Sequence, residues 1–168
     1  GRLGIGTTTN QLNPVLLPSF TGFVDVDAGS AHCLALASDQ TVFAWGANNV
    51  GQLGLGNSTG QLTPVQVPGL SGIVKISAGG DLSMALDNTG RMWTWGVSSL
   101  GRLGRTGTNN VPGVISMTGL SDIFGGPLVY FVWDSSSRLW GWGSDGGTGS
   151  LGFGYYVNWT STPARVSY

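Results

Sequence analysis

A unit that returns three times constrains the fold of this chain more than any other feature of the sequence. Residues 28–46 read AGSAHCLALASDQTVFAWG, residues 78–96 read AGGDLSMALDNTGRMWTWG, and residues 125–143 read GGPLVYFVWDSSSRLWGWG. In each copy the first small residue stands 18 positions before the final glycine (28 to 46, 78 to 96 and 125 to 143). Three equal offsets indicate a repeat protein.

A second marker recurs in phase with the first. The glycine-rich sequences GRLGIG, GQLGLG, GRLGRT and GSLGFG begin at positions 1, 51, 101 and 149, so successive copies start 50, 50 and 48 residues apart. Periods of about 40 to 50 residues are typical of propeller blades and similar arrays. We therefore interpret residues 1–168 as one incomplete propeller domain, with repeats 1–50, 51–100 and 101–148 and a partial repeat 149–168.

Each repeat contains the sequence of four short strands. In the first repeat these are residues 14–18, whose prolines suit a sheet edge, and residues 23–27, 32–36 and 41–45. The 30 glycines and seven prolines interrupt any long helix. The sequence predicts an all-β fold, a β-propeller of about three and a half blades, each a four-stranded antiparallel sheet.

Charge and cysteine content narrow the classes of partner. Only 9% of residues are charged and the net charge is −1, so no basic patch for nucleic acid is expected. The longest apolar run, residues 128–133, is too short to cross a bilayer, and we predict no membrane insertion. The single cysteine, Cys33, allows no disulfide within the chain and is interpreted as a small buried residue.

The phased motifs resemble the regulator of chromosome condensation repeat. The resemblance rests on GQLGLGN at residues 51–57, the proline-led strand at residues 64–67 and the unit at residues 28–46, and it covers nearly the whole chain. It implies a seven-bladed propeller, of which fewer than four blades are present here. Proteins of this family include the exchange factor for the Ran GTPase, interaction domains of ubiquitin ligases, bacterial effectors and a secreted β-lactamase inhibitor. The resemblance therefore implies a fold and leaves the function open.

We predict a non-catalytic scaffold for protein–protein interaction, forming a segment of a larger propeller. One alternative is a guanine-nucleotide exchange factor for a small GTPase. Another is an extracellular or cell-surface module that binds a ligand or inhibits an enzyme. Two glycosylation acceptor patterns, at Asn57 and Asn158, point to an extracellular or surface location.

No catalytic, cofactor or metal site is predicted. His32 stands where the family motif has its usual histidine, but Asp81 and Val129 stand at the places we align with it in the other copies. We therefore interpret His32 as a structural histidine that hydrogen-bonds the backbone within its blade. The loops that begin at Gly51 and Gly101 lack the Gly-Lys-Ser/Thr of a phosphate loop and are interpreted as turns that need positive φ.

Two groups of aromatic residues differ in their relation to the repeat. Tryptophans at one shared position are assigned to packing: Trp45, Trp95 and Trp142. A second group lies outside the shared pattern and is the candidate interaction surface, with packing on a neighbouring blade as the alternative: Phe153, Tyr155, Tyr156 and Trp159.

An arc of fewer than four blades leaves two blade faces uncovered. Exposing on the order of several hundred Å² of apolar surface on each face costs many kcal/mol, at about 25 cal/mol per Å². Remaining blades of a longer polypeptide, a second copy of the chain or a different protein could cover these faces. We expect the first arrangement, since the chain begins and ends within a repeat, and keep a homo-oligomer as the alternative.

Overall fold

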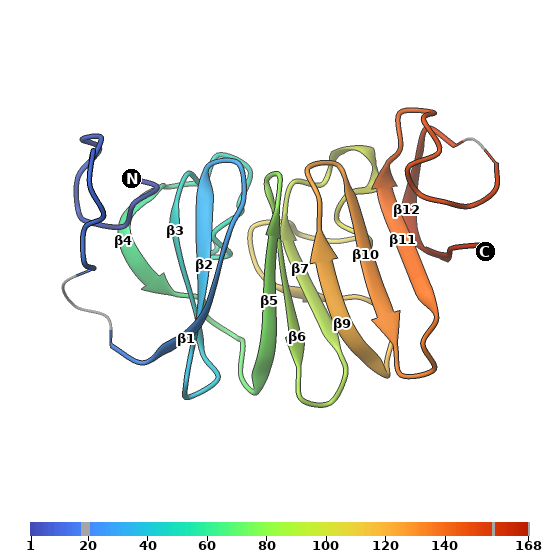
Figure 1. The fold of residues 1–168 in the computed structure, drawn as a ribbon, viewed down its shortest axis with the longest axis horizontal. Helices are drawn as coiled ribbons and strands as arrows, with labels where there is room; N and C mark the ends of the chain where they lie inside the picture. The colour runs from blue at the N-terminus through green and yellow to red at the C-terminus, as the bar shows by residue number, and fades with distance from the viewer. Residues whose placement is uncertain (18–20, 156, 168) are drawn as a thin grey trace.

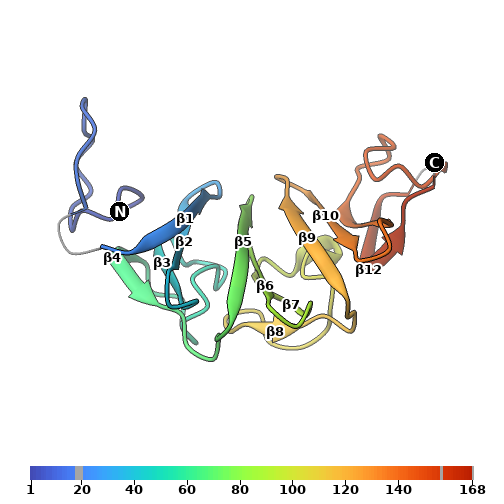
Figure 2. The ribbon, with the colours of Figure 1, turned by 60° about the horizontal axis from the view of Figure 1, so that its bottom comes forward.

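The computed structural model describes residues 1–17, 21–155 and 157–167, and its strands form three antiparallel sheets that stand side by side (Figure 1). Each sheet has four strands, in the orders β1-β2-β3-β4, β5-β6-β7-β8 and β9-β10-β11-β12. The row bends into an open arc with the two termini at opposite ends (Figure 2). The predicted all-β propeller fold is confirmed. The strands are β1 (Phe23–Ala28), β2 (His32–Ala37), β3 (Val42–Gly46), β4 (Gln61–Gln66), β5 (Ile73–Gly79), β6 (Leu82–Asp87), β7 (Met92–Gly96), β8 (Gly113–Val114), β9 (Leu120–Gly125), β10 (Val129–Asp134), β11 (Leu139–Ser144) and β12 (Trp159–Arg165).

Each sheet takes its fourth strand from the sequence repeat that follows. Val65 of β4 pairs with Ala44 of β3, although the repeat boundary lies between them. In the same way, the partial repeat 149–168 supplies β12, which completes the third sheet. The strand predicted at residues 14–18 is wrong for residues 14–17, which form no strand. The corresponding residues of later repeats lie on β4 and β12, each paired with the third strand of the preceding blade, and no described sheet precedes β1. Pro18 lies outside the described residues.

The first strands of the three sheets approach each other closely. Ser77 Oγ on β5 donates a hydrogen bond to Asp27 of β1 (3.2 Å) and accepts one from the Gly125 backbone N–H of β9 (3.0 Å). A Cβ atom added to Gly79 would lie 2.6 Å from the Gly125 carbonyl carbon. The small residues of the repeat unit therefore let neighbouring blades meet at backbone distance.

Two hydrophobic clusters fill the spaces between adjacent sheets. In the first, Leu34 of β2 and Val42 of β3 pack with Ile76 of β5 and Trp95 of β7. The second cluster repeats this arrangement between the second and third sheets. Since burial of each large aliphatic side chain contributes about 1.5 to 3 kcal/mol, the blades are stabilised mainly by their neighbours.

The outward face of the first sheet lacks such a neighbour. Val26 on β1 occupies the position of Ile76 on β5 and Ile123 on β9, yet Val26 is 63% exposed and the two isoleucines are 6% and 5% exposed. Ile76 and Ile123 are buried because each packs against the preceding sheet. The neighbouring blade, rather than the strand's own sheet, determines burial at this position.

Helical structure in the described chain is confined to one short turn, η1 (Ser99–Gly101). Across the residues that the structure describes, no helix has the length and apolar character needed to cross a bilayer.

Candidate functional site

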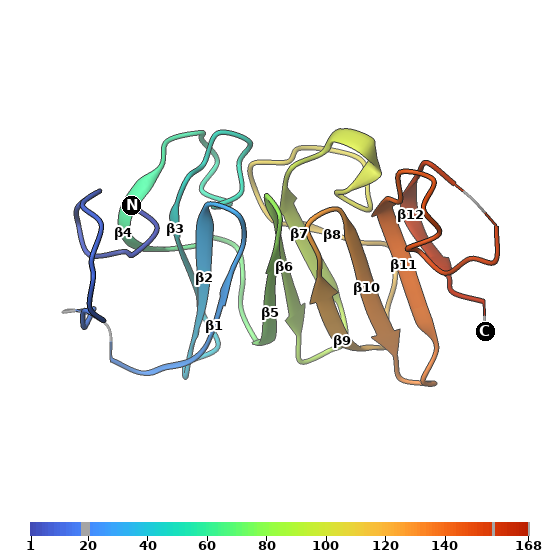
Figure 3. The same ribbon diagram turned by 45° about the horizontal axis from the view of Figure 1, so that its top comes forward.

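The long connections between the third and fourth strands lie along one edge of the arc (Figure 3). They comprise the described residues of 47–60, 97–112, 145–155 and 157–158, and we call them the loop edge. The opposite edge, the hairpin edge, carries the short turns between the second and third strands. Long loops on a rigid scaffold are the usual location of binding residues, so the loop edge is the first place to search.

The loop edge has a shared backbone frame. Gly51 and Gly101 have φ values of 80° and 69°, in the left-handed region that favours glycine. A Cβ atom on Gly51 would lie 2.6 Å from the Cα of Asn110, in the loop of the next blade. The glycine-rich turns therefore join adjacent loops, as their sequence indicates.

The shared tryptophans anchor this frame. Trp45 Nε1 donates to the Arg2 carbonyl (2.8 Å), and Trp142 Nε1 donates to the Arg102 carbonyl (2.9 Å). Trp95 is fully buried, and its Nε1 has no hydrogen-bond partner among the described residues. Cys33 is half-buried, more exposed than predicted, and its thiol approaches the Arg2 carbonyl at 3.4 Å.

A different polar side chain organises each loop. In the first loop, buried Asn48 donates to the carbonyls of Asn57 (3.0 Å) and Thr59 (3.1 Å) and accepts from the Leu53 N–H (2.9 Å). These bonds satisfy backbone groups that the turn leaves unpaired. The amide of Asn48 therefore holds the first loop.

In the third loop, a carboxylate has this role. Asp145 is buried and accepts hydrogen bonds from the backbone N–H groups of Gly149 (3.0 Å) and Leu151 (3.1 Å), and from the Ser150 hydroxyl. The Ser150 bond and the backbone bonds lower the pKa of Asp145, although its burial opposes them. The charge of this carboxylate is compensated within its own loop.

In the second loop, a guanidinium has this role. Arg105 donates to Thr94 Oγ1 (3.2 Å) and to the carbonyls of Thr94 (2.8 Å) and Thr108 (2.9 Å). Burial lowers the pKa of Arg105, which nevertheless stays charged because an arginine begins from a very high value. Sequence reasoning missed Asn48, Arg105 and Asp145, since each resembles an ordinary polar loop residue.

The predicted aromatic surface lies partly on the third loop. Phe153 is buried and its ring centroid is 6.0 Å from that of Tyr155, which is 65% exposed. Trp159, at the start of β12, is 50% exposed, and Tyr156 lies outside the described residues. A shallow hollow of about 390 Å³, lined by residues of the third loop, adjoins Tyr155. Within this set, Tyr155 and Trp159 can contact a partner, while Phe153 supports Tyr155 from below.

His32 is buried and bridges two blades. Its Nε2 lies 2.8 Å from Ser83 Oγ on β6, and Ser83 in turn donates to the Gln52 carbonyl (2.7 Å). We expected a backbone partner, but the structure gives a side-chain hydroxyl that itself binds the backbone. Strand register aligns His32 with Leu82, which pairs with Gly96 as His32 pairs with Gly46, so the alignment with Asp81 was wrong by one residue.

Burial decides the charge of His32. It lowers the pKa to about 4, although Asp81 and Asp27 favour the charged form. Neither His32 nor Ser83 is accessible, with 1% and 0% of their surfaces exposed. The pair therefore has no route to a substrate and acts as a link between blades.

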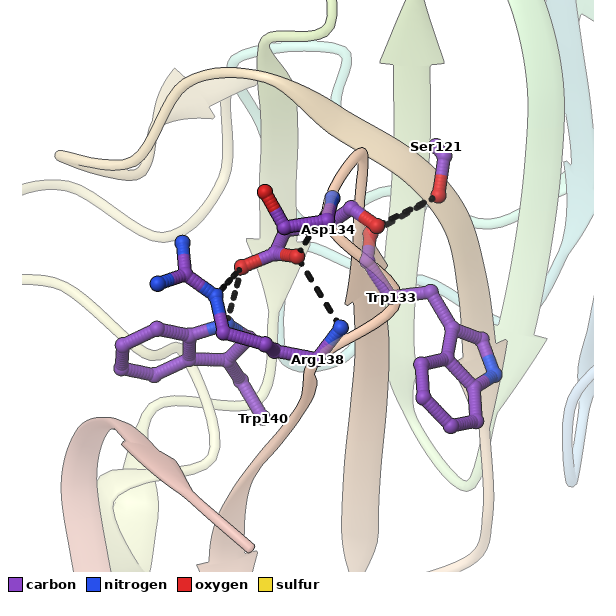
Figure 4. A network of polar contacts seen from close by, with 6 residues as sticks. Ser121, Trp133, Asp134, Arg138 and Trp140 are labelled. Carbon is purple, nitrogen blue, oxygen red and sulfur yellow. Dashed lines mark hydrogen bonds and ion pairs between the residues drawn. The ribbon is translucent and has the colours of Figure 1, made fainter.

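The hairpin edge carries a cluster that the sequence analysis did not identify (Figure 4). Asp134 accepts hydrogen bonds from Arg138 Nε (2.7 Å) and Trp140 Nε1 (3.0 Å), and the guanidinium lies 5.9 Å from the Trp140 ring centroid. Ser121 Oγ donates nearby to the carbonyls of Trp133 (3.3 Å) and Asp134 (3.2 Å). The cluster fastens the β10–β11 hairpin and its exposed arginine stacks on an indole.

The second sheet has the same cluster. Asp87 accepts from Arg91 Nε (2.9 Å) and Trp93 Nε1 (3.4 Å), at the same sequence spacing. Burial raises the pKa of Asp87, but hydrogen bonds from Thr89 and Arg91 outweigh it and bring the pKa to about 2. The Asp-x₃-Arg-x-Trp spacing was visible in the sequence and could have revealed both clusters.

Metal binding is not indicated by the side chains present. Across the part of the chain that the structure describes, no three His, Cys, Asp or Glu residues lie close enough together to hold an ion.

Comparison with protein families and known proteins gives consistent matches. Two models of the regulator of chromosome condensation (RCC1) repeat match, one over residues 1–36 and 39–86 and the other over residues 23–52 and 73–102. The human E3 ubiquitin-protein ligase HERC2 is 48% identical over 50 residues, which are 29% of this chain and 1% of that protein. The human probable E3 ubiquitin-protein ligase HERC4 is 44% identical over 55 residues, which are 31% of this chain and 5% of that protein. The chain thus spans a small part of these relatives.

Solved structures show the same arrangement of blades. Human WBSCR16 superposes with a TM-score of 0.76 at 25% identity, covering 88% of this chain and 38% of that one. Yeast RCC1 (Prp20), in its complex with Kap60, superposes with a TM-score of 0.85 at 19% identity, covering 99% of this chain and 43% of that one. At 19% identity the likeness to Prp20 concerns the fold alone.

Proposed function

Because the chain belongs to the regulator of chromosome condensation (RCC1) repeat family, we propose that it forms three blades of a larger propeller and acts as a non-catalytic scaffold for protein–protein interaction. The loop edge is the proposed binding surface. One observation carries this proposal: the three loops share a backbone frame but are organised by an amide, a guanidinium and a carboxylate. Equivalent loops with different chemistry present a varied surface on a repeated scaffold, which suits recognition better than catalysis.

Proteins of the same fold bind other proteins. A solved structure of Prp20p from Saccharomyces cerevisiae is described together with its binding to Gsp1p and histones, and another contains Kap60. These partners belong to Prp20p and are not carried over to this chain. They support only the general proposal that such a propeller offers a protein-binding surface.

Site-specific photo-crosslinking tests the proposed surface. We expect a photoreactive amino acid at Tyr155 or Trp159 to form discrete protein adducts in extracts of the native source. The matched control is Ser135, which is exposed on the hairpin edge. Adducts of equal number and mass at the control position, or none at the loop edge, would contradict the proposal.

The uncovered faces of the arc require a partner. We propose that further blades of the same polypeptide cover them, with a second copy of the chain as the alternative. The denaturing mass of the polypeptide in its native source separates the two arrangements. A mass far above 17.3 kDa supports further blades, and a mass near that value with a dimeric or larger native mass supports self-association.

A guanine-nucleotide exchange factor is the second candidate function, because the family resemblance includes one. The exchange assay is direct: release of labelled GDP from a small GTPase is followed with and without the protein. Acceleration that saturates with protein concentration would favour exchange activity. An unchanged rate across a panel of small GTPases would leave the scaffold as the better proposal.

An extracellular binding module is the third candidate. Asn57 and Asn158 are both exposed on the loop edge, where a glycan could be attached. Asn57 is also engaged structurally, since its Oδ1 accepts from the Thr59 N–H (2.8 Å). A loss of mass after enzymatic deglycosylation of the native protein would support this candidate, and an unmodified Asn57 peptide would count against it.

A further inference from the structure

The second loop holds an arginine at a position that is apolar in the other repeats. Arg105 corresponds to Ile5, Leu55 and Phe153 in the glycine-rich sequences. Leu55 packs against the first hydrophobic cluster and Phe153 is buried. A cation therefore occupies a position that elsewhere contributes to packing, and the usual packing role does not explain it.

The charge of Arg105 has no acidic partner. Its guanidinium donates to the Thr94 hydroxyl and to the carbonyls of Thr94, Thr106, Thr108 and Val111, at 2.8 to 3.3 Å. Within the part of the chain that the structure describes, Nη1 makes one bond, to Thr106, at 3.1 Å in exposed surroundings. Among the described residues, no carboxylate lies within ion-pair distance of this guanidinium, which is also true of Arg2, Arg102 and Arg165, whereas Lys75, Arg91 and Arg138 each have one.

Two further residues adapt the second blade to this arginine. Gly113 occupies the position of Val65 and Ala164 in the other sheets, and a Cβ atom added to it would lie 2.6 Å from Arg105 Nε. Thr94 corresponds to Ala44, and its hydroxyl accepts from Arg105 Nε. A glycine that makes room and a threonine that accepts a hydrogen bond indicate a built polar site.

A cavity opens beside this site at the outer boundary between the second and third blades. Its volume is about 330 Å³, and Arg105 lies at its wall. The lining combines hydroxyl groups with apolar surface, from Thr106, Ser116, Thr162, Ile115, Met117 and Pro163. Both blades that form the cavity are present in the chain, so the site does not depend on what covers the ends of the arc.

We propose that this cavity binds a carboxylate, supplied by an aspartate or glutamate side chain of a protein partner. The unpaired guanidinium provides the charge, the second Nη1 hydrogen provides a free donor, and the apolar walls accommodate the methylene groups of the ligand. A single free donor suits one carboxylate oxygen better than a phosphate, which needs several. That the carboxylate comes from a protein rests on the proposed scaffold function. The carboxylate site itself can be tested without a partner.

Nuclear magnetic resonance titration with N-acetyl-glutamate N-methylamide tests the site. We expect saturable shifts of the Arg105 Nε–H signal and the Gly107 amide, with binding at least tenfold weaker for the corresponding glutamine derivative. Arg105→Gln should abolish the shifts. Arg102→Gln, which removes the same charge from another half-buried arginine of the same loop, should retain them. Equal shifts with the glutamine derivative, or shifts that survive Arg105→Gln, would overturn the proposal.

A second variant guards against loss of folding. Arg105→Leu combined with Gly113→Val restores the Leu55 and Val65 pair of the preceding repeat and should fold without binding the probe. Inorganic phosphate is the competing anion, and a tighter fit for phosphate than for the glutamate derivative would overturn the carboxylate assignment. Crosslinking at the loop edge tests the scaffold function separately. The carboxylate site and the scaffold function can therefore be overturned independently.

Discussion

His32 Nε2 lies 2.8 Å from Ser83 Oγ, and this hydrogen bond joins the first blade to the second. Ser83 donates its own hydrogen to the Gln52 carbonyl, so its oxygen must accept from His32. The bond fixes the tautomer with hydrogen on Nε2. Nδ1 is then a buried acceptor, and it has no hydrogen-bond partner among the described residues.

This relationship predicts a loss of stability in mild acid. Burial lowers the pKa of His32 to about 4, from about 6.5 in an unfolded chain. The unfolded state therefore binds the proton first. The contribution of neutral His32 to the free energy of unfolding is fully present above pH ~6.5, and it is lost progressively as the pH falls through ~4. We expect a total loss of about 3 kcal/mol, measured by urea unfolding at a series of pH values. His32→Leu should flatten this dependence between pH ~6.5 and ~4.5, and an unchanged slope would contradict the assignment.

Ser83→Ala should destabilise the protein. The change removes the acceptor for His32 Nε2 and the donor for the Gln52 carbonyl, which leaves two buried polar groups unpaired. We expect a cost of about 1 to 3 kcal/mol in the free energy of unfolding, measured by urea denaturation. Ser135→Ala, at an exposed hairpin residue, is the control and should stay within about 0.5 kcal/mol of the parent. A Ser83 variant as stable as this control would be inconsistent with a bridging role.

Asp87→Ala should weaken the second hairpin. Trp93 and two backbone N–H groups lose an acceptor, and Arg91 loses its ion pair. We expect a loss of about 1 to 3 kcal/mol in the free energy of unfolding, measured by thermal and urea denaturation.

The control for Asp87 is Asp39→Ala, in the exposed hairpin of the first blade. Among the described residues, the Asp39 side chain bonds to Thr41 alone and has neither the arginine nor the tryptophan of the cluster. This variant should be much less destabilised than Asp87→Ala. Equal losses would mean that the arginine and tryptophan add nothing beyond ordinary turn geometry.

Two equivalent positions report on the uncovered face. In the 168-residue chain, Ile76→Ala should cost about 2 to 5 kcal/mol, because the side chain is buried between blades. Val26→Ala should stay within about 0.5 kcal/mol, because Val26 is mostly exposed. The same substitution is then made in the protein in its native form. A substantial loss in the free energy of unfolding for Val26→Ala there would show that another element covers this face. A negligible loss there would argue against coverage at Val26.

The sequence predicted the sheets better than it predicted the side-chain networks. The strands at residues 23–27, 32–36 and 41–45 agree with β1, β2 and β3 to within one or two residues, because repeated alternation specifies them. The exception is residues 14–17, which form no strand, because the described residues include no third strand of a preceding blade for them to pair with. A strand needs its neighbour as well as its own residues.

The organising residues of the loops could not be predicted in this way. Arg105 looks like any charged loop residue, and its role appears only when Thr94 and Gly113 are brought beside it by the pairing of β7 with β8. The partner of His32 lies 51 positions away on another blade. The sequence pattern within one repeat carries no information on such contacts. They depend on how the strands of neighbouring blades are placed relative to each other.

The contribution of each fourth strand by the next repeat makes the array interlaced. A protease that cuts within residues 47–60 separates two sequence repeats but leaves β4 hydrogen-bonded to β3, so the two pieces should remain together until the sheet melts. The same arrangement affects deletion of a whole repeat, from one glycine-rich sequence to the next. The preceding blade would then have to pair its third strand with a fourth strand that belongs to a different blade. The sequence repeat is therefore offset from the unit that folds.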